Sequence, residues 1–164
     1  MIETMTKKIS ELMNYRKPEV LYDLYCGYGL LGLSAAPFVK SVIGVEVSGE
    51  AVRSARDNAK RQKVIDVRYI SNKVTAEILN KIFESGPRDE VAILDPPRNG
   101  TDPGVIECLA ERRIKKALHI FCEVDLIPQE ISRWIKSGYK VSKIVPLDMF
   151  PATDNVETMV LLEP

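Results

Sequence analysis

The order of strands and helices along the chain limits the fold more than any other feature of the sequence. Seven short apolar runs have the composition of strands, at residues 19–25, 41–47, 66–71, 91–95, 117–122, 141–147 and 157–163. Amphipathic segments with helical periodicity precede or separate them, at residues 5–13, 30–38, 49–63, 74–85, 103–113 and 127–138. This alternation predicts an α/β fold, with a mostly parallel sheet and helices on both faces.

The last two predicted strands have no helix between them. The connection at residues 148–156 is too short for a usual crossover, so these two strands should form an antiparallel hairpin. A seven-stranded, doubly wound sheet that ends in such a hairpin resembles the Rossmann-like fold of class I methyltransferases. Within the predicted helices, Pro37 should end the segment that begins at Leu30.

Length and composition favour one soluble domain over residues 1–164, with residues 1–19 leading into the first strand. The 23 basic and 23 acidic residues give no net charge, so no polybasic arm for nucleic acid is expected. No apolar run reaches the length of about 20 residues that crosses a bilayer. Three widely spaced cysteines and one histidine make a disulfide framework or a metal site unexpected, as in a reduced, cytoplasmic protein.

A glycine-rich turn follows the first strand, in the segment DLYCGYGLLG. Gly27 and Gly29 allow positive φ and a close approach of a ligand to the backbone. Glu46 ends the second strand about 20 residues later, where a carboxylate accepts hydrogen bonds from ribose hydroxyls. Asp23 lies before the turn and suits an amino-bearing cation better than a pyrophosphate, which favours S-adenosylmethionine over NAD. Asn72 has two open interpretations, a contact with adenine or an N-cap of the next helix.

The fourth strand runs into the segment DPPRNG. Pro96 and Pro97 fix two φ angles and remove two backbone donors, so a stiff turn is expected with the Asp95 carboxylate directed outward. Arg98 follows the prolines and is a candidate contact for an RNA phosphate or a uracil edge. We expect these residues to bind substrate.

Four segments together resemble the RNA uridine-C5 methyltransferases, the family that forms 5-methyluridine in tRNA and rRNA. They are DLYCGYG, VEVSGEAVRSARDNA, DPPRNG and DMFPATDNVETMVLL, and the similarity extends over residues 20–162. The resemblance implies S-adenosylmethionine as cofactor and RNA as partner. It also implies a cofactor pocket lined by Tyr25, Gly27, Gly29, Glu46 and Asp95.

The same resemblance implies that Cys122, after the fifth strand, is the nucleophile and that Glu157 is the general base. A thiolate that adds to C6 of uracil activates C5 toward a methyl group, and a base must then remove the C5 proton. Glu123 and Val124 follow the cysteine where the family has Asn-Pro, and the adjacent carboxylate should raise the thiol pKa. The family's RNA-binding domains have no counterpart in these 164 residues, so RNA binding by this chain should be weak.

Two alternatives remain open from the sequence. The first is a class I methyltransferase with another substrate, in which Cys122 is structural. The second is a non-catalytic S-adenosylmethionine-binding module that needs a partner chain. Other reactive or aromatic side chains are expected to pack in the core, namely Cys26, Cys108, His119, Phe83 and Trp134.

Overall fold

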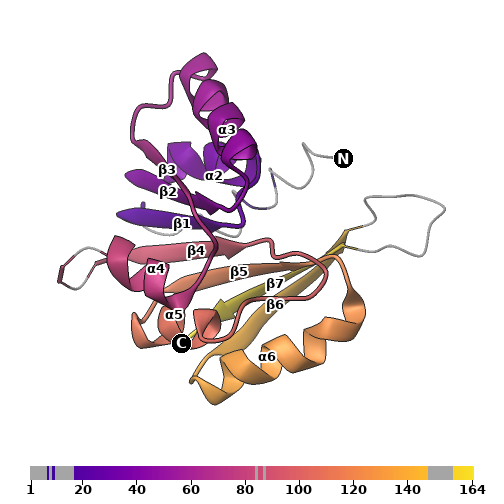
Figure 1. The fold of residues 1–164 in the computed structure, drawn as a ribbon. Helices are drawn as coiled ribbons and strands as arrows, with labels where there is room; N and C mark the ends of the chain where they lie inside the picture. Colours follow the sequence, from indigo (N-terminus) through magenta and orange to yellow (C-terminus); the bar gives the residue numbers. More distant parts are fainter. Residues whose placement is uncertain (1–6, 8, 10–16, 84, 87, 148–156) are drawn as a thin grey trace.

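The structure is a computed structural model that describes residues 7, 9, 17–83, 85, 86, 88–147 and 157–164 (Figure 1). Its strands are β1 (Val20–Leu24), β2 (Ser41–Glu46), β3 (Val67–Ser71), β4 (Glu90–Leu94), β5 (Lys116–Phe121), β6 (Lys140–Leu147) and β7 (Glu157–Glu163). Its α-helices are α2 (Leu30–Ala35), α3 (Gly49–Arg61), α4 (Ala76–Ile82), α5 (Val105–Glu111) and α6 (Ile127–Lys136), and 3-10 turns cover η1 (Ala36–Phe38) and η2 (Val124–Leu126).

The described strands form one seven-stranded sheet in the order β3-β2-β1-β4-β5-β7-β6. β1 to β5 are parallel to one another, whereas β7 is antiparallel to both β5 and β6. The predicted mostly parallel sheet and C-terminal antiparallel pair are therefore confirmed. The chain changes direction in the strand order at β1 and β4, so the carboxyl ends of these two strands flank the expected ligand-binding crevice.

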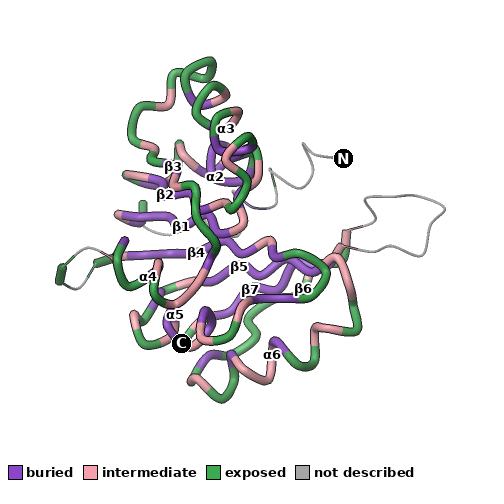
Figure 2. Tube along the Cα trace, viewed as in Figure 1, coloured by how far each residue is buried: buried purple, intermediate pink, exposed green. Residues whose placement is uncertain are grey.

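Helices cover both faces of the sheet, as the alternation predicts. On one face, α4, α5 and α6 pack on a cluster that includes Tyr22, Leu94 and Trp134. On the other face, α2 packs on a cluster that includes Leu21, Ile93 and Leu118. Figure 2 shows the central strands buried along most of their length, with exposed positions on the helices, on the connecting loops and along the edge strand β6. The core is thus two apolar layers that hold the strand ends in fixed positions.

The helix limits follow local side-chain chemistry. The Ser48 hydroxyl accepts a hydrogen bond from Ala51 N (3.2 Å) and caps α3, and Thr75 caps α4 through Ile78 N (3.3 Å). The α2 helix ends at Ala35, and the chain continues as a 3-10 turn that contains Pro37. The expectation that Pro37 ends the α-helix is therefore confirmed.

The predicted lead-in helix at residues 5–13 lies mostly outside the described residues. Lys7 and Ile9 are helical, and Ile9 is fully buried in the cluster under α2. The segment FPATDNV, which belongs to the family resemblance, also lies outside the described residues, as far as Val156.

Candidate active site

The turn after β1 has an unusual backbone conformation at the sheet edge where the parallel strands end. Tyr25, Gly27 and Gly29 have φ values of 60°, 50° and 78°. A Cβ atom on Gly29 would collide with the Tyr69 hydroxyl, so only glycine fits there. A Cβ atom on Gly27 would meet no described atom within 4 Å, so the backbone at Gly27 borders open space.

Glu46 links this turn to the start of α3. Its carboxylate accepts hydrogen bonds from Gly27 N (3.1 Å) and Ser48 N (2.8 Å). Each carboxylate oxygen retains a further lone pair, so Glu46 remains able to accept a hydrogen bond from a ligand hydroxyl. The side chain is thereby held at the carboxyl end of β2 in a defined orientation.

A cavity of about 380 Å³ lies over the ends of β1, β2 and β4. Four predicted site residues line it, namely Tyr25, Glu46, Asp95 and Pro97. The sequence did not single out the other lining residues, Val47, Lys73, Val74, Asn99, Gly100 and Asp102. A larger depression of about 530 Å³ lies at the opposite edge of the sheet and contains none of the predicted site residues.

Asp23 is fully buried and does not line that cavity. Its Oδ2 accepts a hydrogen bond from Gly32 N (2.9 Å), whereas Oδ1 has no hydrogen-bond partner among the described residues. Burial raises the pKa of Asp23 to about 7, and the nearby carboxylates of Asp95 and Glu46 contribute. A buried carboxylate oxygen without a donor is compatible with a cation nearby.

Asn72 does not cap the following helix. Its Oδ1 accepts a hydrogen bond from Lys73 N (2.8 Å), and Thr75 is the N-cap of α4. The capping interpretation of Asn72 is therefore wrong, because the chain runs three residues further before the helix begins. Asn72 N donates to Glu46 O (2.9 Å), which ties the end of β3 to the end of β2 beside the cavity.

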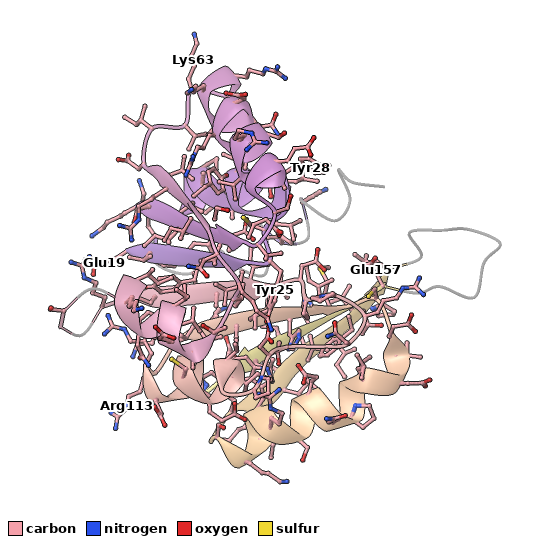
Figure 3. All side chains as sticks on the ribbon, in the orientation of Figure 1. Glu19, Tyr25, Tyr28, Lys63, Arg113 and Glu157 are labelled. Carbon is pink, nitrogen blue, oxygen red and sulfur yellow. The ribbon has the colours of Figure 1, made fainter. Side chains whose placement is uncertain are left out.

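The Asp95 carboxyl, the Cys122 thiol and the Glu157 carboxyl lie at the edge of the sheet where the parallel strands end. Phe121 of β5 pairs with Thr158 of β7, so Cys122 and Glu157 lie at the same end of the two strands. Burial and then Glu157 raise the pKa of the Cys122 thiol, with smaller contributions from Asp95 and Glu123. Burial and Glu157 also raise the pKa of Asp95 to about 6. Figure 3 shows Glu157 and Tyr25 away from Glu19, which precedes β1 at the opposite edge.

Glu123 raises the pKa of the Cys122 thiol, as the sequence predicts. Cys122 is partly exposed, in contrast to Cys26 and Cys108, which are buried as expected. Burial of the Glu157 carboxyl raises its own pKa. The thiol and this carboxyl therefore both favour their protonated forms more than the free side chains do.

The three residues of the DPPRNG segment that are expected to bind substrate differ in exposure. Pro96 is buried, whereas Pro97 and Arg98 are exposed. Arg98 Nη1 forms an ion pair with Glu123 Oε1 at 3.1 Å. This contact joins the segment after β4 to the segment that carries Cys122.

Lys73 and Asp102 form an ion pair of 2.6 Å on the wall of the cavity. Asp102 N also donates to the Tyr25 hydroxyl (3.2 Å). Lys73 follows β3 and Asp102 follows β4, and β2 and β1 lie between these strands. The pair therefore spans the ends of the two central strands, a contact that no sequence spacing signals.

A buried polar network supports the far end of the DPPRNG segment. Glu130 of α6 accepts hydrogen bonds from Thr101 N (3.2 Å) and Thr101 Oγ1 (2.6 Å), and its other oxygen accepts from Arg133 Nη1 (2.9 Å). Gly100 has φ of 81°, and a Cβ atom added to it would lie 3.4 Å from the Glu130 carboxylate. The network fixes the backbone at Thr101 and at the preceding Gly100, which lines the cavity.

The residues expected to pack in the core do so. His119 is fully buried, accepts a hydrogen bond from Trp134 Nε1 (3.2 Å), and has its pKa lowered by burial to about 3. Phe83 packs edge-on against Tyr22. In the described part of the chain, no group of three or more His, Cys, Asp or Glu side chains is placed to hold a metal ion. None of the described helices is long and apolar enough to cross a membrane.

A family model described as tRNA (uracil-5-)-methyltransferase matches residues 1–164. An uncharacterised RNA methyltransferase of Enterococcus faecalis is 32% identical over 160 residues, which are 98% of this chain and 35% of the relative. A similar protein of Chlamydia caviae is 35% identical over 156 residues, which are 93% of this chain and 38% of the relative. The chain thus spans little more than a third of the length of these relatives.

Solved structures share the fold. The tRNA (uracil-54, C5)-methyltransferase of Pyrococcus abyssi, in complex with S-adenosyl-L-homocysteine, superposes with a TM-score of 0.80 and 25% identity over 98% of this chain and 38% of its own. The precorrin-6y C5,15-methyltransferase of Geobacter metallireducens superposes with a TM-score of 0.76 at 13% identity, over 98% of this chain and 88% of its own. The expected class I methyltransferase fold is therefore confirmed.

Proposed function

Because the chain belongs to the tRNA (uracil-5-)-methyltransferase family, we propose that it is the catalytic part of an enzyme that methylates C5 of a uridine in RNA, with S-adenosylmethionine as methyl donor. The observation that carries the proposal is the meeting of Cys122, Glu157 and Asp95 at one edge of the sheet. These groups come from three separate parts of the sequence. Uracil-C5 chemistry needs both a thiol and a base at such an edge.

The residues beside the cavity fit S-adenosylmethionine. Glu46 is held by two backbone donors and has lone pairs free for ribose hydroxyls. The backbone at Gly27 borders open space, and the unpartnered oxygen of Asp23 lies behind the same turn. When bound, the cofactor supplies an electrophilic methyl group on a sulfonium cation. Tyr25, Glu46 and Asp95 would bind and orient it.

Cys122 and Glu157 would carry the chemistry on the uracil. The Cys122 sulfur would form a bond to C6 as the electron pair of the C5–C6 double bond moves toward C5. C5 would then accept the methyl group while the bond between that methyl group and the cofactor sulfur breaks, and the sulfur keeps its electron pair. Glu157 removes the C5 proton, the double bond forms again, and the C6–S bond breaks to release Cys122. The stiff turn at Pro96 and Pro97 would hold the base between these two groups.

The thiol must lose its proton before it adds to C6. The surroundings of Cys122 raise its pKa, so positive charge such as that of the cofactor sulfonium would be needed to stabilise the thiolate. This requirement favours a mechanism in which the thiolate forms only in the complete complex.

The rest of the RNA-binding surface would come from outside these 164 residues. The chain has no net charge and spans little more than a third of its curated relatives. Phosphate contacts supply most of the affinity for RNA, so a neutral domain binds RNA weakly without further basic domains. We therefore propose RNA-binding domains, or a partner chain, as the source of RNA affinity.

The experiment is methylation of a uridine-containing RNA with S-adenosylmethionine that carries a deuterated methyl group. Nucleosides from the digested RNA should contain labelled 5-methyluridine, and Cys122→Ala and Glu157→Gln should each lower its formation at least ~100-fold. Label in another nucleoside would indicate a class I methyltransferase with a different target. Binding of both cofactor and RNA without label in any nucleoside would indicate a non-catalytic module.

A further inference from the structure

The ion pair between Arg98 and Glu123 connects two loops at the proposed active site. Arg98 lies three residues after Asp95, and Glu123 directly follows Cys122. β4 and β5 are neighbouring parallel strands, so the two loops leave the sheet side by side. The 3.1 Å contact therefore holds the segment that would bind substrate against the segment that would carry the nucleophile.

The charges around Cys122 are mainly negative. Asp95 approaches it from the β4 loop, Glu157 from β7 and Glu123 from its own loop. An RNA phosphate that enters this edge would meet three carboxylates. Arg98 is placed to offset this charge, and its planar guanidinium suits phosphate as well as carboxylate.

Stabilisation of the fold does not account for this ion pair. The Arg98 side chain is 74% exposed and that of Glu123 is 36% exposed. Exposed pairs of this kind contribute little to folding free energy, because water and salt screen them. An exposed pair is also easily exchanged, since a competing anion reaches the guanidinium without unfolding either loop.

We propose that Glu123 is a positioning residue, which holds Arg98 beside Cys122 until an RNA phosphate replaces the Glu123 carboxylate. The proposal rests on the function proposed above, because it takes RNA as the substrate. In the free protein, Arg98 neutralises Glu123 and keeps the two loops in register. In the complex, the same guanidinium binds the phosphate next to the target uridine.

The first test is the reactivity of Cys122 toward iodoacetamide without RNA or cofactor, followed by peptide mass spectrometry from pH 6 to 10. Glu123→Gln removes a negative charge beside the thiol and should speed alkylation below the thiol pKa ~2–5-fold. Arg98→Ala leaves Glu123 uncompensated and should slow alkylation by a similar factor. Arg98→Ala in the Glu123→Gln background should have a much smaller effect.

Glu77→Gln is the control, because Glu77 also forms an exposed ion pair, with Lys81 on α4. It should leave the Cys122 profile unchanged. Equal profiles for wild type, Arg98→Ala and Glu123→Gln would overturn the inference.

The second test is binding of a uridine-containing RNA oligonucleotide as a function of salt concentration. Arg98→Ala should weaken RNA binding. It should also reduce the slope of the logarithm of the binding constant against the logarithm of salt concentration by about one. Glu123→Gln should strengthen binding, because it removes the competing carboxylate. Weaker binding by Glu123→Gln would overturn the inference, as Glu123 would then be a contact of the substrate itself.

Failure of this inference differs from failure of the proposed function. If both tests succeed and no labelled 5-methyluridine forms, the positioning role of Glu123 stands and the proposed reaction is wrong. If labelled 5-methyluridine forms and neither test responds to the variants, the reaction stands and the role of Glu123 is wrong. The binding test is made at low salt, where the weak RNA binding expected of this neutral chain is strongest. RNA binding that neither variant changes would overturn the exchange.

Discussion

At the scale of single residues, the reactivity of the Cys122 thiol depends more on its charged neighbours than on its exposure. A cysteine at the end of a buried strand is usually structural, yet Cys122 is partly exposed beside Glu157. Its position fits the proposed nucleophile, and the surrounding carboxylates disfavour the thiolate. The reactivity of the thiol should therefore depend on what neutralises those carboxylates, and Arg98 contacts that of Glu123.

Asp23 gives a pH-dependent prediction. Its pKa is about 7 in the folded protein and near 3.8 in the unfolded chain, so the folded state holds the proton more tightly. The contribution of this raised pKa to the free energy of unfolding is fully present below about pH 4 and is lost as the pH rises through 7. Asp23→Asn should therefore gain stability relative to wild type, by on the order of 2–4 kcal/mol, between pH 4 and pH 8. Urea unfolding at both pH values measures the difference.

Asp57→Asn is the control for that experiment. Asp57 lies on the exposed side of α3, with its side chain 61% exposed. Its substitution should change stability by nearly the same amount at both pH values. A pH-independent effect of Asp23→Asn would mean that the carboxyl is not protonated in the folded protein.

At the scale of elements, Gly29 determines the conformation of the glycine-rich turn and the start of α2. Gly29 has φ of 78° and packs against Tyr69, whereas Gly86 has φ of 90° and no described atom within 4 Å of an added Cβ. Gly86→Ala should cost only the conformational strain, about 1 kcal/mol. Gly29→Ala adds overpacking and should cost ~1–3 kcal/mol more. Thermal unfolding compares the two, and equal losses would contradict the role of the Tyr69 contact.

The Lys73–Asp102 pair gives a prediction about the cavity in which we propose that the cofactor binds. It joins the segments after β3 and β4 across the ends of β1 and β2, so its loss should loosen the cavity wall. Lys73→Ala should raise the dissociation rate of S-adenosylhomocysteine up to ~5-fold, the range of an exposed pair. Lys81→Ala removes an exposed pair on α4 and should leave the rate unchanged. Stopped-flow competition measures both, and identical rates would contradict a closing role for Lys73.

The sequence predicted elements better than contacts. Strand composition and the short link before β7 predicted the parallel sheet and its antiparallel end, and Pro37 predicted the end of α2. These features depend on neighbouring residues in the chain. The cap at Thr75 rather than Asn72 was missed, because both residue types favour that position.

Contacts between distant segments carried no sequence signal. Lys73 and Asp102 meet because β3 and β4 lie on either side of β2 and β1, and Glu130 reaches Thr101 because α6 packs beside the loop after β4. Neither pair has a spacing or composition that distinguishes it from ordinary surface charges. The candidate nucleophile and base were found through the family resemblance, since a lone cysteine and an acid in a hairpin have no such pattern by themselves.

At the scale of the whole molecule, the two edges of the sheet have different characters. The carboxyl edge carries the cavity, the DPPRNG turn and the thiol with its carboxylates. The opposite edge carries a depression lined by Lys17, Lys40 and Lys63 that shares no residue with the proposed site. In the proposed function, a neutral chain that spans little more than a third of its relatives depends on other domains for RNA, and the carboxyl edge carries the residues proposed for the chemistry.

The most direct test of the central claim is covalent trapping with RNA that contains 5-fluorouridine, in the presence of S-adenosylmethionine. Fluorine replaces the C5 proton that Glu157 would remove, so the bond between sulfur and C6 cannot break after methyl transfer. We predict a denaturation-resistant protein–RNA adduct that mass spectrometry maps to Cys122 and that Cys122→Ala abolishes. Binding of RNA and cofactor without an adduct, or an adduct at Cys26 or Cys108, would contradict the assignment of Cys122 as nucleophile.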